Sequence, residues 1–415
     1  MNNLSFPAFA GSRLHLGVTG SISAYKTLDL LRILQPYGVG VSVTLTPAAA
    51  NFVTPLSFLS LDATRVYGEM FTESESPFDH LEPGTTAHVF AVAPLSATTL
   101  ARLAHGFADT MLSAQALAHQ SPLVLAPAMN PRMWANPATQ ANVAIMRQRG
   151  HTVLEPASGM VACGEEGRGK LPPVEDIGWE ILKALAAARN LGPKVEGRPA
   201  MQGQKVLVTL GPTWEHWDGV RIWTNRSTGR MGAALATAAW LMGAEVHAVA
   251  GPGVPGLPPG VHRYNVVSAE EMFNQAESLW PDMRYGVFTA AVADFSPLPH
   301  GSEKFKKDSH SEGFNLHFAP NKDIIATLAA RKRPDQRVLG FAAETSDLED
   351  CVRGKLRRKN ADLIVGNLVG VEGSGFGSSS NAVFVCTKAG REFALPLMNK
   401  GELAWKLLED LCAHS

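Results

Sequence analysis

The sequence predicts an α/β protein with two Rossmann-like domains in tandem, and three observations carry that prediction. First, 415 residues exceed what one compact domain usually holds. Second, apolar runs such as residues 14–18 and 206–210 have no polar break, which is typical of parallel strands buried on both faces. Third, a turn of small residues and a helical pattern follow each run, so strands and helices alternate in both halves of the chain.

Composition and charge exclude several classes of protein. Hydrophobic residues make up 45% and charged residues 18% of the chain, as in globular proteins, and no apolar run reaches the roughly 18 residues of a membrane span. With a formal net charge of −1, bulk electrostatics favour neither nucleic acid nor an anionic membrane. There is no signal-peptide pattern, and the four cysteines form no CxxC pair, which argues against a zinc site or a disulfide framework. We therefore expect a protein of the reducing cytoplasm.

The first expected strand, residues 14–18, leads into a turn that could hold a phosphate. The small residues 19–23 let backbone N–H groups approach an anion at the start of a helix. Because no GxGxxG pattern is present, a mononucleotide is a better guess than a dinucleotide. An ordinary βα turn is the alternative. Two further strands, residues 41–45 and 88–93, end at Thr46 and at the hydroxyl-rich turn 94–99, whose side chains could equally cap a helix.

A fourth strand, residues 123–126, is followed by a stiff elbow that carries Asn130. Pro131 keeps Asn130 out of the helical region, and ligands of open α/β sheets sit beyond the carboxyl ends of the strands. Asn before Pro is also a common turn pair, so this stretch alone supports a binding role and a turn role for Asn130 equally. His80 lies in an upstream loop beside carboxylates, where a lone histidine is usually a surface residue.

A glycine-rich segment, residues 158–171, predicts a mobile flap. It contains Cys163, the one cysteine outside helix-like or strand-like segments, so this thiol is a candidate for acid–base chemistry. We expect a first domain at residues 1–190, a linker at 191–204 that is rich in glycine, proline and charge, and a second domain at 205–415.

In the second domain, polar groups again follow expected strands. Asp294 comes after the strand at residues 285–292, where a carboxylate could meet a ribose hydroxyl or a magnesium ion. Lys304 belongs to a lysine cluster that is normally a solvated face, although after a nucleotide-type strand it could cover a triphosphate. A basic helix, residues 355–360, precedes another strand, and an antiparallel hairpin and a final helix close the chain.

Taken together, these motifs resemble two enzyme families. GSISAYK, APAMNPRMW and GMVACGEEGRGK resemble the homo-oligomeric flavin-containing cysteine decarboxylases. GPTWE, NRSTGRMG, AAVADF, EKFKK, GFAAET and RKNADLIVGN resemble phosphopantothenate–cysteine ligase. Both sets in this order are similar to the bacterial bifunctional enzymes of coenzyme A synthesis. The resemblance covers nearly the whole chain and implies a flavodoxin-like flavoprotein domain followed by a nucleotide-binding ligase domain.

For the first domain, the resemblance implies decarboxylation of phosphopantothenoylcysteine with FMN. His80 matches an active-site histidine that acts on the flavin of a neighbouring subunit, Asn130 a residue that holds the substrate carboxylate, and Cys163 a proton donor. Oxidation of the substrate thiol to a thioaldehyde lets the carboxylate leave, after which the flavin reduces the enethiolate and an acid gives a proton. The implied FMN-binding residues are Gly20, Ser21, Ser23, Thr46 and Ser96.

For the second domain, the resemblance implies that CTP activates 4′-phosphopantothenate as an acyl-cytidylate, which cysteine then attacks through its amine. Asn225 matches a residue associated with that intermediate, and Lys304, with Mg²⁺, could supply positive charge where pyrophosphate leaves. The metal ligands remain unassigned. The implied nucleotide-binding residues are Phe288, Thr289, Ala290, Asp294, Lys304, Lys322, Asp323, Ile324, Ile325, Phe341, Lys355 and Lys359.

The family pattern also implies a homo-oligomer, trimeric through the first domain and dodecameric overall, with small-molecule substrates and neither nucleic acid nor membrane as partner. The chain departs from the pattern at Thr98, at Lys170-Leu171 and at Leu368. Two alternatives stay open: a flavin-binding protein with a non-catalytic regulatory second domain, and an active ligase with a degenerate first domain.

Overall fold

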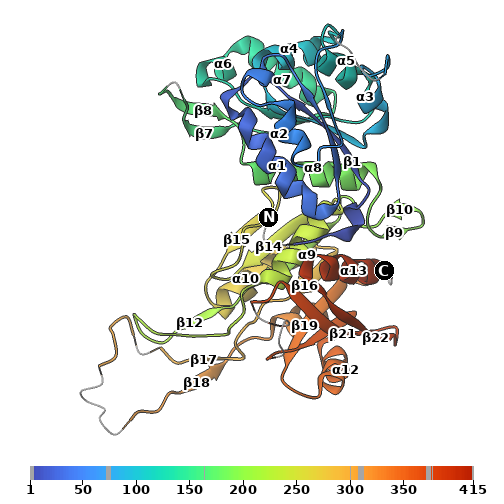
Figure 1. Cartoon of the computed structure of the whole chain (residues 1–415). Helices are drawn as coiled ribbons and strands as arrows, with labels where there is room; N and C mark the ends of the chain where they lie inside the picture. The colour runs from blue at the N-terminus through green and yellow to red at the C-terminus, as the bar shows by residue number, and fades with distance from the viewer. Residues whose placement is uncertain are drawn as a thin grey trace. The chain divides into compact units, whose positions relative to one another are not determined.

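The computed structural model describes residues 4–71, 76–162, 164–299, 301–306, 313–370, 375 and 377–413 (Figure 1). The chain divides into two compact units. Unit 1 is Pro7–Leu191, and unit 2 is Gly192–Ser415 together with the segment that ends at Phe6. No described helix is long and apolar enough to cross a membrane.

Unit 1 is built on a six-stranded sheet in which every neighbouring pair is parallel. Its order is β3 (Arg65–Tyr67), β2 (Gly40–Leu45), β1 (Arg13–Val18), β4 (Val89–Leu95), β5 (Val124–Pro127) and β6 (Thr152–Val153). Every residue of β4 is buried, as expected for a strand covered on both faces. The strand order reverses between β1 and β4, and this reversal opens the crevice where α/β sheets hold ligands.

Helices cover both faces of this sheet (Figure 1). Helices α1 and α8 pack together on one face, and α4 packs with α5 and α7 over a core that includes Phe90, Leu100 and Trp134. The helices are α1 (Lys26–Leu34), α2 (Pro55–Leu59), α3 (Glu82–Thr86), α4 (Ala97–His105), α5 (Met111–Ala118), α6 (Pro131–Ala135), α7 (Pro137–Gln148) and α8 (Val174–Ala188). Short 3-10 helices lie at η1 (Pro7–Phe9), η2 (Ile22–Tyr25), η3 (Gln35–Tyr37) and η4 (Ala49–Asn51).

Unit 2 contains an eight-stranded sheet. Its order is β15 (His262–Asn265), β14 (Glu245–Ala250), β11 (Lys205–Leu210), β16 (Tyr285–Phe288), β19 (Arg337–Glu344), β20 (Leu363–Leu368), β21 (Ser380–Thr387) and β22 (Glu392–Asn399). The first six strands are parallel, and β21 and β22 extend the sheet antiparallel. The order reverses between β11 and β16, so unit 2 repeats the arrangement of unit 1. The prediction of two doubly wound α/β domains is confirmed.

The helices of unit 2 also lie on both faces of their sheet. Helix α9 (Arg230–Leu241) packs with α13 (Lys400–Ala413) on one face. On the other face, α10 (Ala269–Leu279), η5 (Trp280–Asp282), α11 (Ile324–Ala330) and α12 (Leu348–Lys359) enclose a core that includes Phe273 and Trp280. The segment expected to be a linker contains a hairpin, β9 (Lys194–Val195) with β10 (Arg198–Pro199), and the side chain of Met201 is fully buried.

Two hairpin pairs of unit 2 were not expected from the sequence. Strand β12 (Trp214–His216) pairs with β13 (Ile222–Thr224), and β17 (Phe295–Pro297) pairs with β18 (Phe318–Pro320). We call these strands and the described residues between the members of each pair the arm, which extends away from the sheet (Figure 1). The ring centres of Trp217 and Phe314 are stacked 5.3 Å apart, and the Phe305 ring lies 4.9 Å from Trp217 and 4.7 Å from Phe314. An aromatic cluster therefore holds the arm together.

The glycine-rich segment that we expected to be a mobile flap also forms a hairpin. Strand β7 (Ala157–Met160) pairs antiparallel with β8 (Glu166–Lys170), and Gly159 faces Gly167 across the ladder. The hairpin packs on the Asn130 elbow so closely that a Cβ at Gly169 would lie 2.3 Å from the carbonyl oxygen of Met129. Met129 N–H donates to that glycine's carbonyl at 2.9 Å. Glycine is therefore required here by the close approach of two backbones.

Candidate functional sites

Unit 2 has a cavity of about 460 Å³ at the carboxyl ends of its parallel strands, around the reversal between β11 and β16. We call it the unit 2 cavity. It brings together almost all of the predicted nucleotide-binding residues with Asn225, although they come from segments more than a hundred residues apart. The predicted residues that line it are Asn225, Phe288, Thr289, Ala290, Asp294, Lys322, Asp323, Ile324, Ile325, Phe341, Lys355 and Lys359.

The NRSTGRMG motif forms one wall of the unit 2 cavity. Gly229 is the N-cap of α9 with φ +67°, a conformation that favours glycine. One turn later, a Cβ at Gly232 would lie 2.4 Å from the Cβ of Leu210, so only glycine lets α9 approach the end of β11 this closely. The Asn225 side chain donates from Nδ2 to the carbonyl oxygen of Ala291 at 2.9 Å. The motif thus aligns the start of α9 with the loop that follows β16.

That loop is fixed by Asn321, which the sequence reasoning did not single out. Asn321 Nδ2 donates to the carbonyl oxygen of Ala293 at 2.8 Å, and its backbone N–H donates to that of Asp294 at 2.8 Å. The Ser296 hydroxyl donates to Asn321 Oδ1 at 2.7 Å. The Asp294 carboxylate is exposed, lines the cavity and makes no side-chain hydrogen bond or ion pair with another described residue. It is therefore available to a ligand.

Basic side chains give the unit 2 cavity its chemical character. Lys355 forms an ion pair with Glu344 at 2.8 Å, and Lys359 pairs with Asp323, the N-cap of α11. Burial lowers the pKa of Lys359, while the Asp294 carboxylate acts in the opposite direction. Lys322 lies over the ring of Phe273, with its Nζ 4.4 Å from the ring centre. Such a partly desolvated group of cations suits a polyanionic ligand.

Two further cations line the cavity that the sequence reasoning missed, Arg230 and Lys400. The side chain of Lys400 is buried and donates from Nζ to the carbonyl oxygens of Gly375 and Ser378 at 2.9 and 2.7 Å, and Arg230 donates to that of Gly377. Burial, reinforced by the positive charge of Arg230, lowers the pKa of Lys400 to about 8. Arg230 belongs to the NRSTGRMG motif and could have been found there, but no local signal marks Lys400.

Lys304 does not line the unit 2 cavity. It lies exposed on the arm, next to Phe305, whose ring is buried in the aromatic cluster. The Phe305 backbone N–H donates to Asp218 Oδ2 at 3.0 Å, and Asp218 also accepts from the backbone N–H groups of Val220 and Arg221. Burial raises the pKa of Asp218, but these three donors and the Arg221 charge together outweigh it and lower the pKa to about 2. The segment that carries Lys304 is thus tied to the loop between β12 and β13, the other hairpin of the arm.

Unit 1 has a cavity of about 500 Å³ at the carboxyl ends of its own strands. We call it the unit 1 cavity. The predicted residues Ser21, Ser23 and Asn130 line it, together with apolar groups from the elbow and the β7–β8 hairpin, and with Tyr25 and Lys26. The Ser21 and Ser23 hydroxyls are 2.9 Å apart, and Ile22 between them is 61% exposed. A wall with this many apolar groups and few charges differs sharply from that of the unit 2 cavity.

The floor near this cavity is organised by Thr19, another residue that the sequence reasoning did not name as a site residue. Its hydroxyl donates to the carbonyl oxygen of Pro94 at 2.7 Å and accepts from the backbone N–H of Ser96 at 2.9 Å. Thr19 therefore joins the ends of β1 and β4 at the reversal. Ser96 caps α4, with its hydroxyl accepting from Thr99 N–H at 3.3 Å, so the capping alternative holds for this hydroxyl. Gly20, Thr46 and Ser96 do not line the cavity.

Asn130 acts both as a cap and as a wall of the unit 1 cavity. Its Oδ1 accepts from Arg132 N–H at 2.8 Å as the N-cap of α6, which explains the turn character of Asn before Pro. Its Nδ2 donates to Glu165 Oε2 at 3.2 Å, and Glu165 also pairs with Arg132 at 3.2 Å. The amide therefore joins the elbow to the hairpin segment. Cys163, the predicted proton donor, lies outside the described residues.

His80 lies outside the unit 1 cavity, half-buried in the loop before α3. Its neighbour Asp79 pairs with Arg65 at 2.9 Å, and Arg65 also pairs with Glu82 at 2.9 Å. Gln115 Nε2 donates to the Asp79 carbonyl oxygen at 2.8 Å, so the loop is anchored to α5. Within one chain, His80 is therefore not among the residues that line the cavity with Asn130.

Two families of known proteins match the chain, one over most of each unit. Residues 9–186 match the family described as Flavoprotein, and residues 201–414 match the DNA/pantothenate metabolism flavoprotein C-terminal domain. The coenzyme A biosynthesis bifunctional protein CoaBC of Vibrio vulnificus is 37% identical over 97% of this chain and 98% of its own length. That of Bacillus subtilis is 38% identical over 96% of each chain.

Among solved structures, the FMN-dependent cysteine decarboxylase SpaF is 30% identical over 44% of this chain and 99% of its own, with a TM-score of 0.38. The likeness over almost the full length of the bifunctional proteins decides the family, because both halves match in order. The chain therefore belongs to the family of bifunctional coenzyme A biosynthesis enzymes, flavoproteins that join a phosphopantothenate–cysteine ligase to a phosphopantothenoylcysteine decarboxylase.

Proposed function

We propose that the unit 2 cavity is the ligase site, where CTP activates the carboxylate of 4′-phosphopantothenate with release of pyrophosphate, and the amine of cysteine then displaces CMP. The cationic lining at the strand reversal is the observation that carries this proposal. Lys322, Lys355 and Lys359, with Arg230 and Lys400, surround a crevice in the size range of small-molecule sites. The other proposed nucleotide contacts are Phe288, Thr289, Ala290, Asp323, Ile324, Ile325 and Phe341.

Asp294 fits as a ligand of Mg²⁺, because its carboxylate lines the cavity without another described partner. When bound with the triphosphate, Mg²⁺ neutralises part of the charge that pyrophosphate carries away. We assign Asn225 a contact with the acyl-cytidylate, since its hydrogen bond to Ala291 holds the side chain at the cavity wall. We assign Lys304 the charge contact with departing pyrophosphate. Because Lys304 does not line the unit 2 cavity, its segment of the arm must approach a ligase cavity of this kind during the reaction.

We infer that the unit 1 cavity is the decarboxylase site and takes FMN together with the thiol of phosphopantothenoylcysteine. The Ser21 and Ser23 hydroxyls at the start of η2 suit a phosphate or ribityl chain, and Met129, Met160 and Leu171 offer an apolar wall for a flat ring. Gly20, Thr46 and Ser96 would contribute through the backbone around the reversal. When bound, FMN supplies the two-electron oxidation of the thiol and its later reversal.

The chain's own residues then hold the substrate and move a proton. Asn130 presents its amide at the rim, where it can donate to the substrate carboxylate until carbon dioxide leaves. Cys163 would give a proton to the enethiolate carbon, and His80 would act at the flavin of a neighbouring chain. The described cysteines Cys351, Cys386 and Cys412 are free thiols, which supports a reducing cytoplasm as the place of work.

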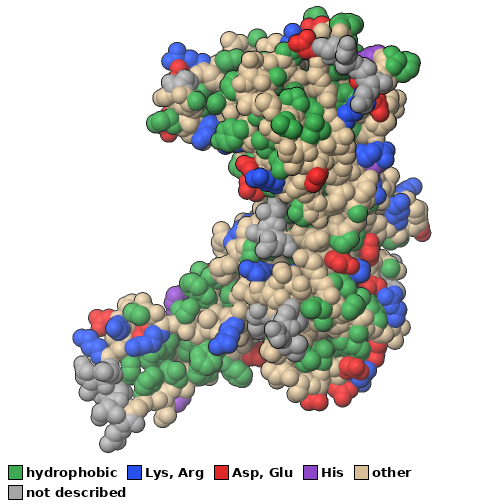
Figure 2. Space-filling model, in the orientation of Figure 1, with side chains coloured by type: hydrophobic (Ala, Val, Ile, Leu, Met, Phe, Trp, Pro, Cys, Tyr) green, Lys and Arg blue, Asp and Glu red, His purple; other side chains and the backbone are tan. Residues whose placement is uncertain are grey.

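Exposed apolar side chains support a homo-oligomer, which we propose to be trimeric through unit 1 and dodecameric overall. Phe78 and Leu81, in the loop that carries His80, are 63% and 40% exposed, and Phe71 is 94% exposed. Figure 2 shows apolar side chains gathered over the arm of unit 2, where Trp223 is 51% and Phe295 53% exposed. Such patches are typical of interaction surfaces. Light scattering on the full chain tests this, and a monomer with bound flavin would contradict it.

Product analysis tests the two activities together. The full chain is supplied with 4′-phosphopantothenate, cysteine, CTP and Mg²⁺, and products are followed by mass spectrometry. We expect CMP, pyrophosphate, carbon dioxide and 4′-phosphopantetheine, with phosphopantothenoylcysteine as a transient. Accumulation of phosphopantothenoylcysteine without carbon dioxide, on protein that carries its flavin, would contradict the proposed decarboxylase site but leave the ligase site standing.

A further inference from the structure

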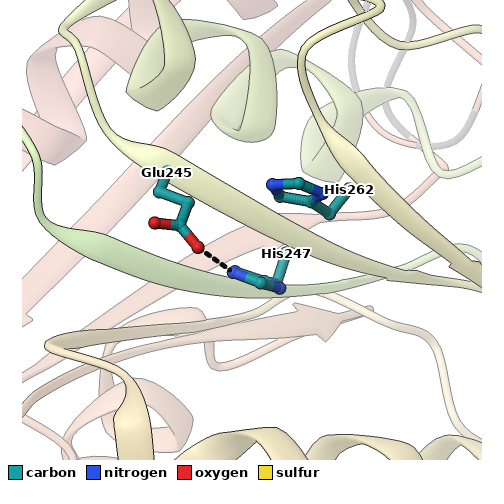
Figure 3. A group of neighbouring side chains, drawn as sticks. All are labelled: Glu245, His247 and His262. Carbon is teal, nitrogen blue, oxygen red and sulfur yellow. Dashed lines mark hydrogen bonds and ion pairs between the residues drawn. The ribbon is translucent and has the colours of Figure 1, made fainter.

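Three side chains gather at the amino-terminal ends of the last two parallel strands on one side of the unit 2 sheet, β14 and the edge strand β15. Neither cavity is lined by these residues. Glu245 and His247 lie two residues apart on β14 and therefore project from the same face. His262, the first residue of the edge strand β15, is paired with His247 in the parallel ladder, so it projects from that face as well. Figure 3 shows the carboxylate and the two imidazole rings lying side by side.

The three groups are close enough to share one ion. One carboxylate oxygen and one nitrogen from each ring all lie within 4.8 Å of one another. The His247 and His262 rings are stacked at 4.9 Å with an angle of 24° between their planes. His247 Nε2 is 2.9 Å from Glu245 Oε1, and neither ring nitrogen of the exposed His262 makes a hydrogen bond with another described residue. Ligands carried on two paired strands need only small side-chain rotations to converge.

A supporting group completes the resemblance to a metal site. The Tyr264 hydroxyl lies 3.1 Å from His247 Nδ1, the ring nitrogen that faces away from Glu245. Such a contact fixes the tautomer and the ring orientation of a ligating histidine. Two imidazoles and one carboxylate are the donors that zinc and similar transition metals prefer, with the fourth position left to water. Mg²⁺ prefers oxygen ligands and would not select this set.

We propose that Glu245, His247 and His262 form a site for a divalent transition metal such as Zn²⁺, which clamps the edge strand β15 onto β14. The site is independent of the nucleotide cavity. Glu245 and His262 begin their strands, whereas the cavity lies at the carboxyl ends, about 16 Å away along a six-residue strand. The ion would therefore act on the stability of the sheet edge and would take no part in catalysis.

One neighbouring cation competes with the metal. Lys205 Nζ lies 3.8 Å from Glu245 Oε1, so a bound ion must displace or tolerate this positive charge. Exposed ion pairs are weak, and a metal that gains three ligands outcompetes this lysine. This competition predicts a variant that should raise metal affinity instead of lowering it. Removal of the lysine charge in Lys205→Gln should tighten metal binding severalfold. A site that existed only as a salt-bridge cluster would show no such gain.

The test uses the full chain with excess Mg²⁺ and no nucleotide. Zn²⁺ is titrated against a chromophoric chelator, and Co²⁺ is added separately to read the ligand field on the long-wavelength side of the flavin bands. We expect one tight Zn²⁺ per chain and a tetrahedral Co²⁺ spectrum in the parent. His262→Ala should abolish both, and Tyr264→Phe should weaken affinity by about 10- to 100-fold, the effect of losing an outer-shell partner.

The matched control is His317→Ala, which removes another exposed histidine of unit 2 and should leave the tight site unchanged. Ligase turnover without Zn²⁺ should stay near the parental value in His262→Ala, which shows that the variant is folded. Equal Zn²⁺ affinity in the parent and in His262→Ala would overturn the proposal, as would weaker binding in Lys205→Gln. In that case the trio is only a hydrogen-bonded cluster at the sheet edge.

Discussion

The two cavities occupy the same place in two similar folds and yet have opposite chemistry. Both lie at the carboxyl ends of parallel strands, near the point where the strand order reverses. The unit 1 cavity is lined mainly by apolar groups, with two serines and the two lysines Lys26 and Lys170, whereas five basic side chains line the unit 2 cavity. The sheet therefore decides where a ligand binds, and the loops decide which ligand it is.

The difference also concerns how each site is completed. In unit 2, the backbone carbonyls of Gly375 and Ser378 accept from Lys400, and Asn321 fixes the Asp294 loop, so most proposed contacts converge within one chain. In unit 1, His80 lies apart from the cavity beside exposed apolar side chains. We expect the redox site to depend on assembly and the nucleotide site to depend on charge. Variants that change only one unit test that contrast, and the reaction proposed for the unchanged unit serves as the internal control.

Cys163→Ser should have the largest effect and should act only on the unit 1 reaction. Removal of the proposed proton donor should slow formation of 4′-phosphopantetheine by about 10²–10⁴-fold, the usual scale of general acid catalysis. Flavin binding, thiol oxidation and ligase turnover should continue. Rapid-quench mass spectrometry follows the oxidised, decarboxylated thiol. Cys351→Ser serves as the control, and an unaltered yield from the Cys163 variant would remove this thiol from the mechanism.

Lys304→Gln is the corresponding test in unit 2. If the lysine contacts pyrophosphate mainly in the transition state, its loss should slow acyl-cytidylate formation by about 10²–10³-fold, as for a deleted oxyanion donor. Decarboxylation of supplied phosphopantothenoylcysteine should be unchanged. Lys306→Gln, also exposed on the arm, is the matched control in a pyrophosphate-release assay. Near-parental rates in both variants would show that Lys304 is only a solvent-exposed surface residue with no role in pyrophosphate release.

The sequence predicted the sheets well because buried parallel strands leave a local signal. The run at 206–210 lies within β11, and the turn after it could be recognised from Gly211 and Pro212. The residues that line the unit 2 cavity could be recovered through motifs, since Asn225 and Asp294 stand in characteristic strings. Lys400 could not, because it reaches the cavity from the start of α13, where burial and not a local pattern defines its role.

The arm shows a different limit of sequence reasoning. Its strands are three residues long, too short for an alternating pattern to appear, and their stability comes from rings that meet across distant segments. Trp217 and Phe314 are almost a hundred positions apart, and nothing near either one indicates the stack. The glycines of the β7–β8 hairpin predict a mobile flap, and they also allow the close packing on the elbow that the structure shows.

Asn130→Asp should have an intermediate effect in unit 1. The new carboxylate would face Glu165, 3.2 Å from the present amide nitrogen, and would repel the substrate carboxylate. We expect KM for phosphopantothenoylcysteine to rise by about 10- to 100-fold, because a hydrogen bond to a charged group is worth about 1.5–3 kcal/mol. Ligase kinetics should not change. Steady-state decarboxylation measures the effect.

Asn136→Asp is a closely matched control for that variant. Asn136 also precedes a proline and caps a helix, with its Oδ1 accepting from Ala138 N–H at 2.9 Å, but it does not line the unit 1 cavity. The same change at this second cap should leave decarboxylation near the parental rate. If the two variants behaved alike, Asn130 would be a turn residue whose place at the rim has no consequence for binding.

Lys400 gives the smallest predicted effect and the one with two opposite signs. Its folded pKa is about 8, below the ordinary value of 10.5, so the folded chain loses this proton first. Between pH 8 and 10.5 the unfolded chain binds more protons, and the free energy of unfolding contributed by Lys400 must rise with pH.

The same deprotonation removes a positive charge from the unit 2 cavity, so KM for CTP should rise by about fivefold, the factor for about 1 kcal/mol. Lys400→Met should lose both dependences, whereas the exposed Lys388→Met should keep them. Denaturant unfolding and CTP kinetics from pH 7 to 10 measure the pair. A KM that stays flat with pH in the parent, while stability rises, would show that Lys400 holds Gly375 and Ser378 without contacting the nucleotide. The charge contrast between the two cavities would then rest on Lys322, Lys355 and Lys359.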